Sequence, residues 1–240
     1  MQIEVVTTCN RQIWEVYGRA MAESFVRYWP KDVHFTVYGD EFFLTPFGVQ
    51  WRSMKVICWH QAFKQRHADN ADAHGKIGGL KPYRRDAYKF SHKVAALTDL
   101  ALEMREGILI WIDADTFTDR PVTHECLRRW LPPGSPMSLL KRRGTCPECG
   151  FMMFDVAAVR DLMLEFQDIY ASDQVFKLRE THDSFVMWHL IGKLGLSTYN
   201  LTADDAANSH PWIGSDIGRY MDHLKGSRKE MGASPERRIG

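Results

Sequence analysis

The first 40 residues combine short β-branched runs with one segment of helical periodicity. Residues 3–8 predict a strand, and residues 33–40 predict a second strand that ends in a turn. Between them, apolar residues recur every three or four positions from Ile13 to Tyr28, which is typical of an amphipathic helix. A strand, a helix and a strand in this order favour a parallel pair joined by a right-handed crossover.

The pattern stops after residue 40 and resumes near residue 91. Residues 41–90 mix Gly, Pro, His and charge without periodicity, which indicates a long loop or short helices. We expect Ser91 to be the N-cap of a helix that ends near Gly107. Residues 108–112 are apolar without alternation, as in a strand buried on both faces. We further predict strands at 137–144 and 150–156, helices at 156–170, 173–180 and 183–194, and a polar, basic tail over the last 30 residues. The fold class is therefore α/β, with a mostly parallel central sheet flanked by helices.

Composition excludes several classes of protein. With 45% hydrophobic residues the chain can bury a core, and a net charge of +1 produces no global field for nucleic acid, membrane or acidic partners. Five scattered cysteines argue against a disulfide framework. No apolar run approaches the roughly 18 residues of a membrane span, and the first residues lack a signal peptide's features. We therefore expect a cytoplasmic protein with no membrane partner.

Two acids, Asp113 and Asp115, follow the apolar strand in the sequence ILIWIDADTFTD, residues 108–119. Residues two apart on a strand point to the same face, and ligands of open α/β sheets bind at the carboxyl ends of strands. A hard divalent cation held by one or two carboxylates together with substrate phosphates suits such a pair. The alternative is a polar turn with one capping and one solvated acid.

The same residues also come close to the Asp-x-Asp-x-Thr pattern of haloacid-dehalogenase-like phosphatases, with Phe117 at the place of the threonine. In that reading Asp113 is the nucleophile, and Asp204 and Asp205 are the later acidic pair. However, the nucleophile of those enzymes follows the first strand of the core, whereas strand, helix and strand already precede Asp113.

The chain contains two motifs in succession. The Asp-x-Asp that follows the strand comes first, and a His-x-x-Gly-x-x-Lys element, formed by His223, Gly226 and Lys229, comes later. In these features the chain resembles GT-A-fold glycosyltransferases, most closely the retaining kind typified by glycogenin and the bacterial lipooligosaccharide galactosyltransferases. The chain departs from that pattern after Lys229, where Glu230 and Met231 replace the family's Pro-Trp.

The resemblance implies a single GT-A domain over residues 1–240, with a nucleotide-sugar half at 1–115 and an acceptor half at 116–240. It implies a metal-dependent hexosyltransferase that uses a nucleotide sugar, with a UDP-sugar favoured, and that retains the anomeric configuration. A metal and a lysine would stabilise the departing diphosphate. The implied metal ligands for Mn²⁺ or Mg²⁺ are Asp113, Asp115 and His223; the implied donor-binding residues are Thr7, Thr8, Asn10, Lys93, Asp113, Gly226 and Lys229. The implied sugar or acceptor pocket contains Cys149, Gly150, His182 and Asp183, and the implied catalytic residues are Asp183, Asp115 and Glu148.

Each of these residues also has a plain structural alternative. His223 and Lys229 fit an exposed, frayed terminus, Lys93 fits a solvated lysine, and Asp183 fits an N-cap. Thr7, Thr8 and Asn10 fit ordinary turn polarity. The Cys-x-x-Cys formed by Cys146 and Cys149 is an isolated zinc or redox signal without a second pair.

The acceptor is open at the level of sequence. Basic clusters at 81–93 and 141–144, with Tyr83, Tyr88 and Phe90 in the first, fit either a nucleic-acid groove or solvated loops. Trp188 and Trp212 suit a glycan groove instead. Parts of the chain also resemble glycosyltransferase-like proteins common in phages, some of which glycosylate hydroxymethylated bases in DNA. We therefore expect one of three acceptors: such DNA in the host cytoplasm, a glycan, or a small compound with a hydroxyl group. A non-enzymatic alternative is a module that binds a nucleotide without turnover. The oligomeric state is not predicted.

Overall fold

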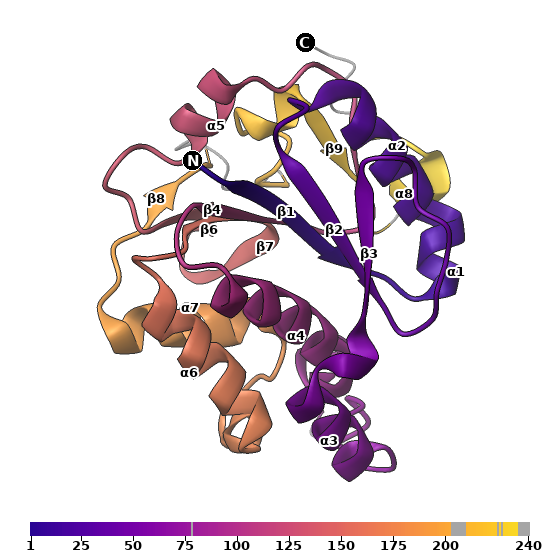
Figure 1. Ribbon diagram of the computed structural model, residues 1–240. Helices are drawn as coiled ribbons and strands as arrows, with labels where there is room; N and C mark the ends of the chain where they lie inside the picture. Colours follow the sequence, from indigo (N-terminus) through magenta and orange to yellow (C-terminus); the bar gives the residue numbers. More distant parts are fainter. Residues whose placement is uncertain (78, 203–209, 225, 227, 235–240) are drawn as a thin grey trace.

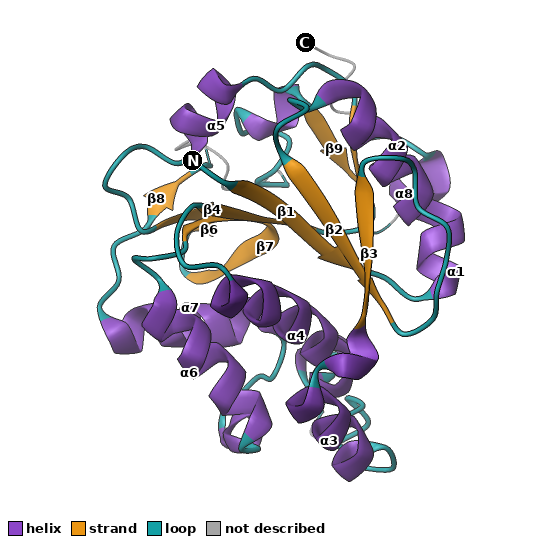
Figure 2. Ribbon diagram, viewed as in Figure 1, coloured by secondary structure: helices purple, strands orange, loops and turns teal. Residues whose placement is uncertain are grey.

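The computed structural model describes residues 1–77, 79–202, 210–224, 226 and 228–234. A seven-stranded sheet with the order β3-β2-β1-β4-β7-β6-β8 lies between two layers (Figure 1). One layer consists of helices α3, α4, α6 and α7; the other contains α1, α2, α5 and a small sheet of β5 and β9 (Figure 2). The strands are β1 Ile3–Thr8, β2 His34–Gly39, β3 Val49–Ser53, β4 Ile108–Ile112, β5 Thr116–Thr118, β6 Met137–Arg142, β7 Thr145–Asp155, β8 Tyr199–Asn200 and β9 Met221–His223.

The helices follow the strands in the order expected for an α/β protein. The α-helices are α1 Arg11–Ile13, α2 Arg19–Tyr28, α3 Cys58–His67, α4 Ala87–Glu103, α5 His124–Trp130, α6 Arg160–Ala171, α7 Asp183–Leu194 and α8 Arg228–Met231. A π-helical turn, Trp14–Gly18, joins α1 to α2, and 3₁₀ turns occur at Met54–Val56, Pro82–Arg84, Gln174–Lys177 and Ile217–Arg219.

Strand directions explain how distant segments reach one edge of the sheet. β1 pairs in parallel with β2 and β4, β2 with β3, and β6 with β8. β7 is antiparallel to both β4 and β6, and Ile112 at the end of β4 pairs with Phe151 near the middle of β7. The predicted mostly parallel α/β sheet is confirmed. Because β7 runs backwards, the residues just before Phe151 lie beside those that follow Ile112.

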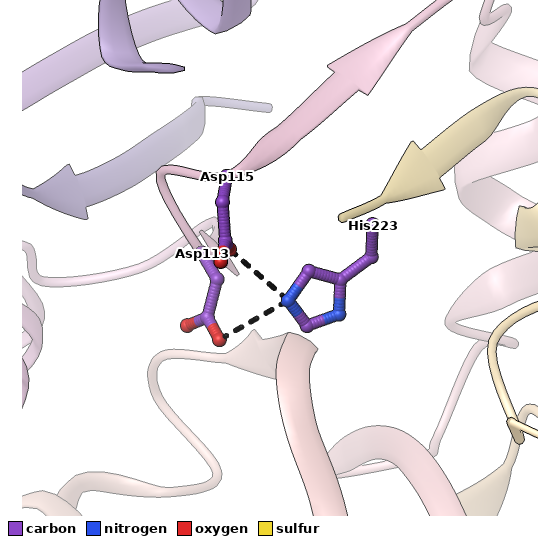
Figure 3. Close-up of side chains that lie close together, drawn as sticks. All are labelled: Asp113, Asp115 and His223. Carbon is purple, nitrogen blue, oxygen red and sulfur yellow. Dashed lines mark ion pairs between the residues drawn. The ribbon is translucent and has the colours of Figure 1, made fainter. Parts of the chain in front are cut away.

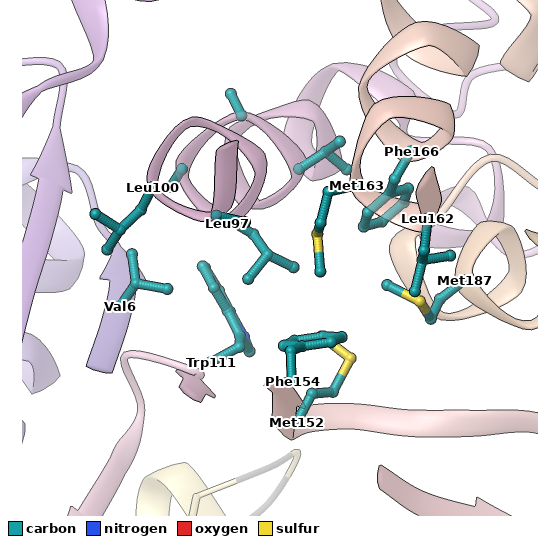
Figure 4. Close-up of a cluster of buried hydrophobic side chains, with 14 of the residues drawn as sticks. Val6, Leu97, Leu100, Trp111, Met152, Phe154, Leu162, Met163, Phe166 and Met187 are labelled. Carbon is teal, nitrogen blue, oxygen red and sulfur yellow. The ribbon is translucent and has the colours of Figure 1, made fainter. Parts of the chain in front are cut away.

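Two hydrophobic clusters fill the space on either side of the sheet. β4 contributes Leu109 and Trp111 to one cluster and Ile110 and Ile112 to the other, so it is buried on both faces as predicted. In the first cluster, Leu97 of α4 packs with Trp111, and residues of β7, α6 and α7 complete the layer (Figure 4). Both clusters include residues from before and after residue 115.

Several predicted elements differ from the structure. Helix α4 begins at Ala87 because Asp86 is its N-cap and accepts a hydrogen bond from the Lys89 backbone N–H; the predicted cap, Ser91, is buried inside the helix. Residues 41–90 contain β3 and α3, which lack the periodicity that would have revealed them. The predicted helix at 173–180 is only the turn Gln174–Lys177.

The predicted polar tail is also wrong for the described part of the last 30 residues. Trp212, Ile217 and Met221 are fully buried, and β9 pairs with β5. Burial of Trp212 removes it as a platform for a glycan. No helix in the described ranges is long and apolar enough to cross a membrane.

Candidate functional site

Asp113 and Asp115 lie in the turn that joins β4 to β5. The Thr116 backbone N–H donates to the Asp113 carbonyl at 3.1 Å, and the Asp113 N–H donates to the Gly150 carbonyl of β7 at 2.8 Å. The acids therefore converge through a turn anchored to β7. The prediction that they share the face of a strand is wrong, because β4 ends at Ile112.

His223 completes this group from a segment far away in the sequence. It is the last residue of β9 and pairs with Thr116 of β5, which places it directly beside the two acids. Its Nε2 lies 3.1 Å from Asp115 Oδ1 and 3.7 Å from Asp113 Oδ2 (Figure 3). The imidazole is 3% exposed, so the alternative of an exposed histidine in a frayed terminus is wrong.

These three residues form a group that fits a divalent metal ion. One ligand atom from each lies within 4.8 Å of the others, and two carboxylates with one imidazole suit metals such as Mn²⁺. Gly150 keeps the space beside them open: a Cβ there would lie 2.8 Å from His223 Cε1 and 3.3 Å from Asp113 Oδ2. The buried Nδ1 of His223 has no hydrogen-bond partner among the described residues. The donor set and its cradle are thus consistent with the predicted metal site.

The charges of the group are strongly coupled. Burial opposes charge on Asp115, but hydrogen bonds and charges from His223 and Lys229 hold its pKa well below the usual range. Burial likewise opposes protonation of His223, yet Asp115 and Asp113 raise its pKa. The two carboxylates thus favour the protonated form of the histidine. The site is built for positive charge between Asp113 and Asp115.

Lys229 approaches the same carboxylate from helix α8. Its Nζ lies 2.7 Å from Asp115 Oδ2 and 5.1 Å from the centre of the Tyr17 ring. Gly226 adopts a φ of 63° in the turn before α8, and its carbonyl accepts a hydrogen bond from the Lys229 N–H at 3.1 Å. The His-x-x-Gly-x-x-Lys element therefore brings an imidazole and an ammonium group to one carboxylate.

Lys93 connects the metal group to a second buried carboxylate. Its Nζ lies 3.1 Å from Asp113 Oδ1 and 2.7 Å from Asp183 Oδ2, and it donates to the Cys149 carbonyl at 2.5 Å. The ammonium also lies 4.8 Å from the centre of the Trp111 ring, whose indole N–H donates to Asp113 at 2.7 Å. Lys93 is 7% exposed, so it is not the solvated lysine of the alternative reading.

Asp183 is the first residue of α7 and is not its N-cap, which is His182. Burial works against its charge, but Lys93 and His182 hold its pKa well below the usual range. Burial lowers the pKa of His182, but Asp183 and the Cys146 thiol outweigh it and raise this pKa to about 10. His182 Nε2 also lies 3.0 Å from Glu180. An ionised Asp183 thus stands between Lys93 and a protonated His182.

The remaining predicted pocket residues lie on β7. Glu148 is buried and forms an ion pair with Arg142 across the β6–β7 hairpin. Cys146 and Cys149 are free thiols, and burial raises the pKa of Cys149. Neither cysteine belongs to the metal-ligand group found in the described chain. The Cys-x-x-Cys therefore has no zinc partner there, and Cys149 acts through its carbonyl.

The predicted donor residues at the end of β1 have local partners. Thr8 donates to the Tyr38 carbonyl at 3.1 Å, and the Asn10 side chain caps α1 by accepting from the Ile13 N–H at 2.8 Å. The Thr7 hydroxyl is buried without a hydrogen-bond partner among the described residues. Since Val6 pairs with Trp111, these residues leave the sheet at the same edge as Asp113. Their contact with a donor stays a prediction. Asp204 and Asp205 lie outside the described residues.

Sequence reasoning missed Trp111, Tyr17 and Glu180. Trp111 lies on β4 two positions before Asp113, and residues two apart at the end of a strand tend to point to the same side. Tyr17 gave no signal, because its partner Lys229 is distant in the sequence. Glu180 gave none, because it contacts His182 from a loop without a periodic pattern.

Comparisons with known proteins agree with the architecture. No family model and no curated protein matches the sequence. Among solved structures, the fold is similar to that of mouse xyloside xylosyltransferase 1 in a crystal structure of its apo form. The TM-score is 0.50 at 11% sequence identity, over 84% of this chain and 86% of that one. At this identity the similarity establishes the fold alone. The chain therefore has a GT-A-like α/β fold, with an Asp-Asp-His group of metal-ligand geometry at the carboxyl end of its central strand.

Proposed function

We propose that the protein is a metal-dependent glycosyltransferase that moves a hexose from a nucleotide sugar to an acceptor hydroxyl. The observation that carries this proposal is the convergence of Asp113, Asp115 and His223 at the edge of a GT-A-like sheet. Asp113 and Asp115 come from the turn after β4, and His223 comes from β9. A divalent ion such as Mn²⁺ or Mg²⁺ bound by them would neutralise the diphosphate of the donor as the glycosidic bond breaks.

Other residues of the chain are placed to bind the diphosphate and the transferred sugar. Lys229 lies beside the metal group, from which its ammonium can reach a diphosphate, and Gly226 shapes the turn that presents it. Lys93 ties Asp113 to Asp183 and so sets the distance between the metal group and the sugar pocket. Asp183, which shares Lys93 with the Cys149 carbonyl, is the residue that we assign to the pocket of the transferred sugar, together with Gly150 beside the metal group.

Three finer features of the proposal rest on the resemblance of the sequence motifs. A UDP-sugar is the favoured donor, transfer proceeds with retention, and Thr7, Thr8 and Asn10 hold the nucleoside. Hydroxymethylated DNA and simple sugars are the acceptors to compare.

The test is a transfer assay with Mn²⁺, a panel of nucleotide sugars and either hydroxymethylated DNA or simple sugars, followed by mass spectrometry of all products. We expect a hexose mass gain on an acceptor, its loss in chelator, and a fall of at least about 100-fold in Asp115→Asn, since a metal ligand acts on the transition state. Asp69→Asn, an exposed acid elsewhere, is the matched control and keeps full activity.

Three results would contradict the proposal. Full transfer by Asp115→Asn in chelator would exclude the metal mechanism. Release of phosphate from a generic ester, with a phospho-aspartate trapped at Asp113, would identify a phosphatase. Binding of a nucleotide sugar without transfer or hydrolysis would identify a binding module.

A further inference from the structure

A row of aromatic rings passes beside Asp183 and is exposed at both of its ends. The Tyr83 ring lies 5.8 Å from the ring of His182, His182 lies 6.4 Å from Phe185, and Phe185 lies 5.9 Å from Trp188. Tyr83 and Trp188 are 47% and 46% exposed although both are large and apolar. We call Tyr83, His182, Phe185 and Trp188 the aromatic row.

The row has a rigid foundation. The Thr181 backbone N–H donates to the Arg84 carbonyl at 2.8 Å, which ties the segment with Tyr83 to the residues preceding α7. His182 is 6% exposed and is held by Glu180 on one side and by the Cys146 thiol of β7 on the other. The exposed rings at each end are therefore presented by ordered backbone.

Two arginines lie beside the aromatic row and share a single acid. Arg84 and Arg179 both lie 3.2 Å from the same oxygen of Glu180, so two guanidinium groups share one buried carboxylate. The Arg179 guanidinium also lies 5.2 Å from the centre of the Phe185 ring. At the β6–β7 hairpin, Arg142 pairs with buried Glu148, and Arg143 in the turn is exposed. This surface carries excess positive charge on a chain that is nearly neutral as a whole.

Exposed ring faces bordered by cations match one class of polymer. Unpaired bases stack on aromatic side chains, while the sugar-phosphate backbone is attracted to nearby arginines. A neutral glycan also stacks on aromatic rings but gains nothing from the excess positive charge, and in a closed duplex the base faces are covered. Tyr88, also in the basic segment 81–93, faces elsewhere, because it packs against His74 and His92.

We propose that the aromatic row and its arginines bind a single-stranded or locally opened nucleic acid, with bases stacked on Tyr83 and Trp188. Because His182 in the row lies beside Asp183, with 3.9 Å between Nδ1 and Oδ1, a strand bound on the row passes close to the carboxylate that Lys93 holds against the metal group. Its role as the acceptor site rests on the proposed transferase function. Binding itself does not, and can be measured without metal or nucleotide sugar.

The test is fluorescence anisotropy of the full chain in low salt, with four probes of equal length. They are an oligothymidine, the same strand with abasic sites, a duplex, and a neutral oligosaccharide. We expect the oligothymidine to bind best, with affinity falling as salt rises, and the abasic strand and the duplex to bind more weakly. Tyr83→Ala and Trp188→Ala should each weaken oligothymidine binding by about fivefold or more, since stacking of one base contributes roughly 1–3 kcal/mol.

Matched controls separate stacking from general effects. Tyr199 is also a large exposed ring, 40% exposed, but lies on β8 at the sheet edge, and Tyr199→Ala should bind like the wild type. Both row variants should keep wild-type affinity for the abasic strand, which reports that the fold and the arginines are intact.

The proposal is overturned if oligothymidine and the abasic strand bind equally, if both row variants bind oligothymidine like the wild type, or if only the oligosaccharide binds. The last result would identify a glycan surface. Strand binding without any transfer would leave this inference standing and contradict the proposed function instead.

Discussion

Lys93 shows how burial changes the role of a charged side chain. A lysine near the start of a helix is normally solvated, but here its ammonium is enclosed by Asp113, Asp183, the Cys149 carbonyl and the Trp111 ring. Burial lowers the pKa of Lys93, but the two carboxylates outweigh it and raise this pKa above its usual range. A buried charge of this kind is tolerated only with its partners in place.

Replacing Lys93 with methionine should destabilise the protein strongly. The change leaves two carboxylates near the protein interior without their shared cation, and breaking such a buried pair costs about 3–5 kcal/mol. Urea unfolding at pH 7 measures the loss. Lys89→Met, at an exposed position of the same helix, should stay within about 0.5 kcal/mol of the wild type. Adding Asp183→Asn to Lys93→Met should restore part of the stability; no recovery would show that the carboxylates are not the cause.

At position 150 only glycine fits, because there is no room for a side chain beside the metal group. A methyl group there meets the imidazole of His223 and approaches the Asp113 carboxylate. Gly150→Ala should therefore weaken Mn²⁺ binding, measured by calorimetry, by about tenfold or more, because ligand positions within a few tenths of an ångström decide metal affinity. Gly192→Ala provides the control. A Cβ at Gly192 in α7 meets nothing within 4 Å, so that variant should bind Mn²⁺ normally and gain about 0.5–1 kcal/mol of stability. Equal Mn²⁺ affinity in both variants would contradict the steric argument.

At the scale of elements, contacts between helices and between strand ends support the site. α3 packs on α4 through His60, which is fully buried and lies 3.1 Å from the Ser91 hydroxyl. Ser91 donates its own proton to the Tyr88 carbonyl, so the Ser91 oxygen accepts a hydrogen bond from His60 Nε2. Its Nδ1 has no partner in the described chain. A second proton would thus place a buried N–H without an acceptor.

The α3–α4 contact should make stability depend on pH. Burial, with contributions from His92 and Lys64, lowers the pKa of His60 to about 3, whereas the unfolded chain takes up the proton near 6.5. The unfolded state therefore binds more protons between these values, and stability falls as pH decreases through this window. Between pH 7 and pH 5 the wild type should lose about 2 kcal/mol more than His60→Gln does, measured by urea unfolding. Parallel losses in the two proteins would show that His60 does not titrate as described.

Two hydrogen bonds join strand β9 to the segment after helix α8. Asp222, next to His223, accepts hydrogen bonds from the Ser234 backbone N–H at 2.8 Å and from its hydroxyl at 2.6 Å. Both residues are buried, and Lys229 lies between them in the chain. We call these two hydrogen bonds the latch. The latch holds α8 in the position from which Lys229 reaches Asp115.

Loss of the latch hydroxyl should weaken binding of a nucleoside diphosphate. Ser234→Ala removes one hydrogen bond to a buried carboxylate, which is worth about 1.5–3 kcal/mol. We expect UDP affinity in Mn²⁺, measured by calorimetry, to fall by about fivefold or more, because Lys229 is less well positioned. Ser172→Ala also removes a serine hydroxyl bond, an exposed one to the Asp168 carbonyl at the end of α6, and should leave UDP affinity unchanged. Equal UDP affinity in Ser234→Ala and the wild type would separate the latch from Lys229.

At the scale of the whole molecule, the metal group joins parts of the chain that are distant in sequence. Asp113 and Asp115 follow the central strand of the large sheet, while His223 belongs to the small sheet packed on its face. An ion bound there would link the two sheets in the folded state and would bind the unfolded chain poorly. Metal binding should therefore stabilise the entire fold.

Mn²⁺ should raise the melting temperature, and chelator should reverse the rise. At a free concentration about 100 times the Kd, binding adds about 2.7 kcal/mol of stability. For a chain of this size that corresponds to roughly 5–10 °C, measured by calorimetry or circular dichroism. Asp69→Asn should show the full rise and Asp115→Asn little of it. An equal rise in both variants would place the ion elsewhere.

The sequence by itself determined the elements whose pattern is strong over a short distance. β1, β2, the buried β4, the helical segment from Ile13 to Tyr28 and helix α7 follow from periodicity, because burial of one stripe or of a whole strand leaves a local pattern. The acids of the metal group were predictable for the same reason, since both follow β4 directly. The pairing of His223 with them followed only from the resemblance to a known motif.

Only the tertiary structure decided what each charged group faces. The antiparallel course of β7 brings Gly150 and the Cys149 carbonyl to Asp113, and the pairing of β9 with β5 turns an apparent tail into a buried wall of the site. These contacts join residues that lie tens of positions or more apart, and local pattern carries no information about such pairs. Burial then sets their protonation, because removing water makes each charge depend on its immediate partners. For this reason Lys93, His182 and Asp183 acquired definite roles only in the folded chain.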